Sequence, residues 1–225
     1  MPNTYRPWGP LQWVISQLPG DPWSLLGVLG TEDRCVAALN ALNTGLNAKK
    51  FFKILDPHMS PASAFDERFV EIQGRLEKEG LLSSDICTVD LLQDIDTIKE
   101  ELDSFLQQAG HRVIIDITSM PKRWFFPITR FMLQYEDVST IIFTYTSAEA
   151  YEEQLSSDPA ALGPLPTFDS PRGADSYDEL VVGVGFAPLG LRDIFEADIG
   201  KVRYLFPFPP RAPKLFSKLG FPSQP

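Results

Sequence analysis

Hydrophobic positions change period several times along the chain and divide it into alternating strand-like and helix-like segments. Short runs of β-branched and aromatic residues predict strands, and apolar residues three and four positions apart predict amphipathic helices. Strands are predicted at Trp13–Leu18, Leu25–Leu29, Phe51–Leu55, Ile86–Leu91, Arg112–Ile117 and Thr140–Thr146. Helices are predicted at Thr31–Asn43, Ser63–Glu79 and Ile95–Gly110. Such alternation is typical of parallel strands joined by helical crossovers.

We therefore expect an α/β fold, a Rossmann-like three-layer sandwich with a mainly parallel central sheet. Arg112–Ile117 carries β-branched residues on both faces, which favours a central strand covered on each side. A segment rich in Trp and Phe follows it. Pro127 should interrupt a helix there, so the part up to Phe126 is predicted as a shaped loop or a kinked turn.

Composition shifts divide the chain into four parts. Residues 1–150 are predicted to form the Rossmann-like core. Residues 151–178, which are acidic and rich in Pro, Ser and Gly, are expected to form a lid or an interaction loop. Residues 179–208 read as a strand–helix–strand unit that continues the same sheet. Residues 209–225 form a tail of prolines and aromatics that is expected to dock on a protein partner.

Charge and composition exclude several function classes. The 225 residues include 20 Lys and Arg against 30 Asp and Glu, a net charge of −10, which argues against general nucleic-acid binding. No apolar run approaches the roughly 18 residues of a membrane span, and the first residues lack a secretory pattern. Cys35, Cys87 and two histidines give neither a disulfide framework nor metal-ligand spacing. We expect a cytoplasmic protein without a resident cofactor.

The segment from Ile115 to Arg123 is the main candidate for chemistry. It follows the predicted central strand, and ligands of open α/β sheets bind outside the carboxyl ends of strands. Thr118 or Ser119 would cap the next helix, whose first N–H groups attract anions. Lys122 and Arg123 are unfavourable at that end of a helix, and a bound phosphate would remove the conflict. Alternatively, Asp116 bonds a neighbouring turn and both cations are solvated.

Four of these positions resemble a known motif. Asp116, Thr118, Ser119 and Lys122 are similar to the Asp-x-Thr-small-x-x-Lys turn of CRISPR-associated Rossmann-fold sensor domains and related antiviral nucleotide sensors. The resemblance spans Ile86 to Tyr145, and Met120-Pro121 stands where that family commonly has Gly-Thr. In that family the turn contacts a cyclic oligonucleotide, usually at a homodimer interface. The resemblance implies that Thr118, Ser119 and Lys122 contact ligand, that Asp116 fixes the turn and that the chain is a homodimer.

Other polar residues follow neighbouring strands. Thr146 and Ser147 are expected to line the same pocket with hydroxyl groups, although ordinary strand-end residues would look alike. The segment from Thr31 to Arg34 opens a helix after Gly30, and capping is favoured there over ligand contact. His58 could act as an acid or base, but a surface histidine in a turn is the favoured interpretation.

Three functions are compatible with these patterns. We favour a non-enzymatic module that senses a nucleotide or phosphorylated small molecule, in a regulatory or antiviral role. The alternative is a hydrolase or transferase on a nucleotide or phosphosugar, with Asp116 or Asp56 as base or Mg²⁺ ligand and His58 assisting. The third is a scaffold subunit of a larger complex that binds no ligand.

Overall fold

The computed structural model describes residues 9–18, 20–42, 45–55, 63–78, 80–148, 165–168, 176–183 and 198–205. The chain divides into two compact units, Met1–Ala148 and Glu149–Pro225. The strands of the first unit are β1 (Ser24–Leu29), β2 (Lys49–Leu55), β3 (Ile86–Asp90), β4 (Arg112–Asp116) and β5 (Thr140–Thr144). Its helices are α1 (Leu11–Ser16), α2 (Ala37–Leu42), α3 (Ser63–Lys78), α4 (Ile95–Ala109) and α5 (Lys122–Gln134), with short 3-10 helices η1 (Asp33–Val36) and η2 (Ser83–Asp85).

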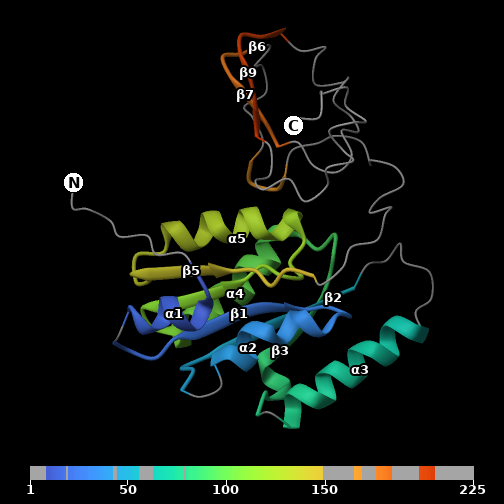
Figure 1. Cartoon of the computed structure of the whole chain (residues 1–225). Helices are drawn as coiled ribbons and strands as arrows, with labels where there is room; N and C mark the ends of the chain where they lie inside the picture. The colour runs from blue at the N-terminus through green and yellow to red at the C-terminus, as the bar shows by residue number, and fades with distance from the viewer. Residues whose placement is uncertain are drawn as a thin grey trace, which may run out of the picture. The chain divides into compact units, whose positions relative to one another are not determined.

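The five strands of the first unit form one parallel sheet in the order β3-β2-β1-β4-β5. Figure 1 labels β1, β2, β3 and β5 of this sheet. The chain moves outward from β1 to β3, then returns to the other side of β1 and continues through β4 to β5. The direction of strand order therefore reverses between β1 and β4. This arrangement confirms the α/β Rossmann-like sandwich. The prediction that Arg112–Ile117 forms a central strand covered on each side is confirmed, since β4 is fully buried and lies between β1 and β5.

Helices cover both faces of the sheet. On one face, Leu26, Val28 and Ile115 pack in a cluster with residues of α4 and α5. On the other face, Leu25 and Leu29 pack in a second cluster with residues of η1, α2 and α3. Successive residues of β1 thus enter opposite cores, which explains why an unbroken apolar run forms this strand.

Two local predictions were wrong because packing overrides a local signal. The predicted strand at Trp13–Leu18 is α1, in which the N–H of Val14 bonds the carbonyl of Pro10. The apolar residues of this segment pack on the core at helical spacing. Pro127 does not interrupt α5 either, since the helix runs from Lys122 through Pro127 to Gln134. Its buried face repeats along the whole helix, and this burial outweighs one lost backbone bond.

The second unit contains two short parallel ladders among its described residues. β6 (Ser176–Tyr177) pairs with β8 (Asp198–Ile199), and β7 (Leu180–Gly183) pairs with β9 (Val202–Leu205), with the same residue offset in both. Residues 179–208 were expected to continue the five-stranded sheet, but their described strands pair with each other. Alternating apolar patterns identify a strand without specifying its partner. The predicted helix in this part, the tail at 209–225 and most of 151–178 lie outside the described residues.

Across the described residues, no helix combines the length and the apolar character needed to cross a bilayer.

Candidate functional site

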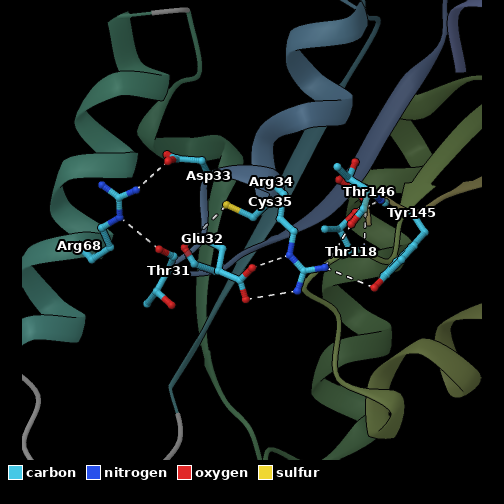
Figure 2. Close-up of polar contacts among 11 residues, drawn as sticks. Thr31, Glu32, Asp33, Arg34, Cys35, Arg68, Thr118, Tyr145 and Thr146 are labelled. Atoms are coloured by element: carbon cyan, nitrogen blue, oxygen red, sulfur yellow. Dashed lines mark hydrogen bonds and ion pairs between the residues drawn. The ribbon is translucent and has the colours of Figure 1, made fainter. Parts of the chain in front are cut away.

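Three segments of the first unit meet at the carboxyl edge of the sheet. They are the β1 loop (Gly30–Cys35), the β4 turn (Asp116–Pro121) and the β5 end (Tyr145–Ser147), and they follow strands that are neighbours in the order β1-β4-β5. Parallel strands end at the same edge, so these segments surround the point where the strand order reverses. Figure 2 shows side chains of all three together.

The β4 turn is held by a buried carboxylate. Asp116 is 2% exposed, and its Oδ1 accepts hydrogen bonds from the backbone N–H of Thr118 at 3.0 Å and from its hydroxyl at 2.5 Å. Burial raises the pKa of Asp116, while the bonds from Thr118 and the charge of Arg34 act in the opposite direction. The carboxylate therefore fixes the turn, which is the part that the sequence motif implied for it.

The β4 turn is bonded to the β5 end through Thr118. Its Oγ1 accepts a hydrogen bond from the backbone N–H of Thr146 at 2.9 Å while its hydroxyl proton goes to Asp116. Neither Thr118 nor Ser119 caps α5, contrary to prediction. Pro121 occupies the N-cap position, and its carbonyl accepts from the N–H groups of Trp124 and Phe125.

Gly30 allows the β1 loop to approach the β4 turn closely. A Cβ atom at Gly30 would lie 2.7 Å from Oγ and 3.1 Å from Cβ of Ser119, so only glycine fits without movement. The carbonyl of Gly30 also accepts from the thiol of Cys35 at 3.7 Å. Burial raises the pKa of this thiol, and Cys35 packs in the core.

Arg34 connects the β1 loop to the β5 end (Figure 2). Its Nε and Nη2 donate to the Glu32 carboxylate at 2.5 and 3.2 Å. Its Nη1 donates to the Tyr145 hydroxyl at 3.3 Å and to the Thr146 carbonyl at 3.1 Å. The sequence favoured a capping role for this segment, but Glu32 occupies the N-cap position of η1 without a side-chain cap bond. The local sequence pattern did not reveal this role of Arg34, because its partners in the β5 end are distant in sequence.

The β1 loop is also tied to α3. Asp33 pairs with Arg75 at 2.7 Å and with Arg68 at 3.0 Å, and the Nε of Arg68 donates to the carbonyl of Thr31 at 3.1 Å. The bond from Arg75, with the charges of both arginines, lowers the pKa of Asp33. The loop is thus stabilised by interactions at the protein surface.

Lys122 and Arg123 begin α5 directly after the β4 turn. Lys122 is exposed and Arg123 is half-buried. Among the described residues neither cation has an acidic partner. Two positive charges at the positive end of a helix repel its dipole, so the arrangement favours an anion at this position.

A pocket of about 480 Å³ lies beside the β5 end. Its walls come from the segment around α1, from α2 and from β5, and they include Thr146 and Ser147. The other predicted residues (Asp116, Thr118, Ser119, Lys122 and Arg123) do not line it. The structure therefore divides the predicted site into a pocket with hydroxyl groups and a separate cationic turn, joined by the bond between Thr118 and Thr146.

Of the residues named for the enzymatic alternative, Asp116 alone lies in the described parts of the chain. No group of three or more His, Cys, Asp or Glu side chains is placed to hold a metal ion among those parts. Asp56 and His58 lie outside the described residues. Asp116 is buried and bonded within its own turn.

Comparisons of the chain with protein-family models, curated proteins and solved structures found no match.

Proposed function

We propose that the first unit is a sensing or regulatory module that binds the phosphate of a nucleotide or phosphorylated small molecule at the β4 turn. One observation carries the proposal. A buried carboxylate, Asp116, fixes the turn immediately before α5, while the cations that follow, Lys122 and Arg123, have no acidic partner among the described residues.

The start of α5 offers matching donors for a phosphate. The backbone N–H groups of Lys122 and Arg123 precede the first bonds within the helix, which begin at Trp124. Such groups bind phosphate oxygens, and the helix dipole adds to the attraction. Lysine contributes a mobile point charge and arginine a planar fork that binds two oxygens. Because Asp116 holds the turn in place, this arrangement is formed before any ligand arrives.

The position and the motif support the same conclusion. The turn lies beside the reversal of strand order, where open α/β sheets bind ligands. Asp116, Thr118, Ser119 and Lys122 resemble the turn of antiviral nucleotide sensors, and the expected antiviral role and homodimer rest on that resemblance alone. Binding is favoured over catalysis because the Asp116 carboxylate is hydrogen-bonded within its own turn.

Thermal unfolding against mono-, di- and cyclic oligonucleotides, with and without Mg²⁺, tests the proposal. A ligand at a hundredfold its Kd adds about 2.7 kcal/mol to the free energy of unfolding, which raises Tm measurably. We expect at least one nucleotide to raise Tm of the wild type and Lys122→Ala to lose that shift. Lys78→Ala is the matched control, because Lys78 is also an exposed lysine and lies in the last turn of α3.

Each other result has a distinct meaning. A shift retained by Lys122→Ala would place the ligand away from the β4 turn and contradict the proposal. Metal-dependent turnover of the nucleotide would favour the hydrolase or transferase. If no member of the panel shifts Tm, the scaffold function is favoured instead.

A further inference from the structure

We propose that Arg34 is a second phosphate contact of this site and that Glu32 occupies it in the free protein, so that a nucleotide displaces Glu32 while its nucleoside part enters the neighbouring pocket. The inference rests on the proposed function and extends it. It adds two residues to the site, names a nucleoside phosphate as the ligand class and assigns a competing role to an acidic side chain.

The pair formed by Glu32 and Arg34 has the geometry of an arginine bound to an oxyanion. Two nitrogens of the guanidinium, Nε and Nη2, donate to two oxygens of the carboxylate. A phosphate presents two oxygens to the same fork in the same way. Glu32 therefore occupies the edge of Arg34 that a phosphate would use.

Burial differs between the two partners. The Glu32 side chain is 60% exposed, whereas that of Arg34 is 21% exposed. An exposed carboxylate returns to water at little cost, and an ion pair at a protein surface contributes little net stability. Displacement of Glu32 by a doubly charged phosphate is therefore favourable.

Arg34 stays in place when Glu32 leaves. Its remaining nitrogen, Nη1, donates to the carbonyl of Thr146 and to the hydroxyl of Tyr145, and neither bond involves Glu32. The guanidinium also lies 5.9 Å from the centre of the Tyr145 ring. The fork is thus preorganised, which lowers the entropy cost of binding.

The pocket beside the β5 end would hold the nucleoside part of the ligand. Tyr145 and Thr146, which hold Arg34, also line the pocket of about 480 Å³. This volume lies in the usual range for small-molecule sites. Small side chains of α2 form another wall, and no lining residue carries a charge. An uncharged sugar and base match such walls. Arg34 does not line the pocket itself and is joined to it through Tyr145 and Thr146.

Calorimetric titration with the four nucleoside 5′-monophosphates, the corresponding nucleosides and inorganic phosphate tests the inference. We expect one nucleotide to bind the wild type more tightly than its nucleoside or phosphate alone. Loss of a charge-assisted pair costs about tenfold in affinity or more, so Arg34→Gln should weaken binding of that nucleotide by this factor while its nucleoside binds as before.

Glu32→Gln is the decisive variant, because it should tighten nucleotide binding by removing the competing carboxylate. Glu77→Gln is the matched control, since Glu77 is an exposed acid on α3 that accepts a hydrogen bond from Gln73 of the same helix. Glu77→Gln should leave affinity unchanged. The ¹⁵N–¹H signal of Arg34 Nε should move on nucleotide addition in the folded wild type, which reports exchange of its partner directly.

The outcomes separate this inference from the proposed function. If Lys122→Ala abolishes nucleotide binding but Arg34→Gln and Glu32→Gln leave it unchanged, the inference is wrong and the phosphate site at the β4 turn stands. If Glu32→Gln weakens binding, Glu32 contacts the ligand and does not compete with it. If neither the wild type nor Glu32→Gln binds any of these nucleotides, this inference is overturned, and the phosphate site at the β4 turn is overturned as well when no member of the thermal-unfolding panel raises Tm.

Discussion

The β1 loop and the β4 turn lie at the same edge of the sheet but are stabilised in opposite ways. The β1 loop depends on exposed ion pairs, such as those of Asp33 with Arg68 and Arg75. The β4 turn depends on hydrogen bonds from Thr118 to the buried Asp116. Exposed ion pairs of the β1 loop can break at little cost because water solvates the separated charges. The β4 turn, in contrast, cannot open without leaving buried polar groups without hydrogen bonds. The β4 turn is therefore the fixed part of the candidate site, and Glu32 is the part that we propose to exchange.

The largest expected effect comes from removing the acceptor inside the β4 turn. Asp116→Ala leaves the buried N–H of Thr118 without a partner, which should lower the free energy of unfolding by about 2 kcal/mol. Urea unfolding at neutral pH measures this change. Asp116→Asn retains an oxygen acceptor and should restore most of the stability. An Asn variant as unstable as the Ala variant would show that the turn requires the charge rather than the acceptor.

An intermediate effect is expected where the two loops touch. Gly30→Ala places a methyl group against Ser119, and overpacking of this kind should cost about 1 kcal/mol. Ser119→Gly removes the atoms in the way, so the double variant should recover the loss. The double-mutant cycle from denaturant unfolding tests the contact. Additive effects of the two substitutions would mean that the loops do not meet at this point.

The smallest effect, and the sharpest test of the comparison, is the pH dependence of stability. The pKa of Asp116 is raised above 3.8, so the native state binds its proton more readily than the unfolded chain does. Its contribution to stability falls as pH rises from 3.8 through the native pKa. The pKa of Asp33 is lowered below 3.8, so its stabilising contribution is present above 3.8 and is lost as pH falls through the native pKa.

Asp116→Asn and Asp33→Asn should therefore change the pH profile in opposite directions. As pH rises through the acid range, the stability of Asp116→Asn should increase relative to the wild type, and that of Asp33→Asn should decrease. Urea unfolding of the three proteins across this range gives both differences. Slopes of the same sign would contradict the contrast between a buried and an exposed carboxylate.

The sequence predicted most elements of the first unit because their signals are local. The apolar period and Gly110 indicated where α4 ends, and Gly110 follows the helix with a φ of 69°. α1 was misread as a strand because a short apolar run has no decisive period, and packing on the core selects the helix. The predicted interruption of the helix at Pro127 was wrong for the same reason, since burial of one face of α5 offsets the loss of a backbone hydrogen bond at the proline.

The candidate site likewise contains contacts that are local in sequence and contacts that are distant in sequence. Asp116 and Thr118 are two positions apart, so the identities of neighbouring residues already specify the bond between them, and the sequence indicated this turn. Arg34 and Thr146 are far apart in the chain, as are the walls of the pocket on α2 and β5. Contacts of that kind exist only after parallel pairing brings the ends of β1, β4 and β5 to one edge. Local periodicity determines the elements and their turns, whereas strand order determines which turns share a site, because partner choice depends on the packing of the whole sheet.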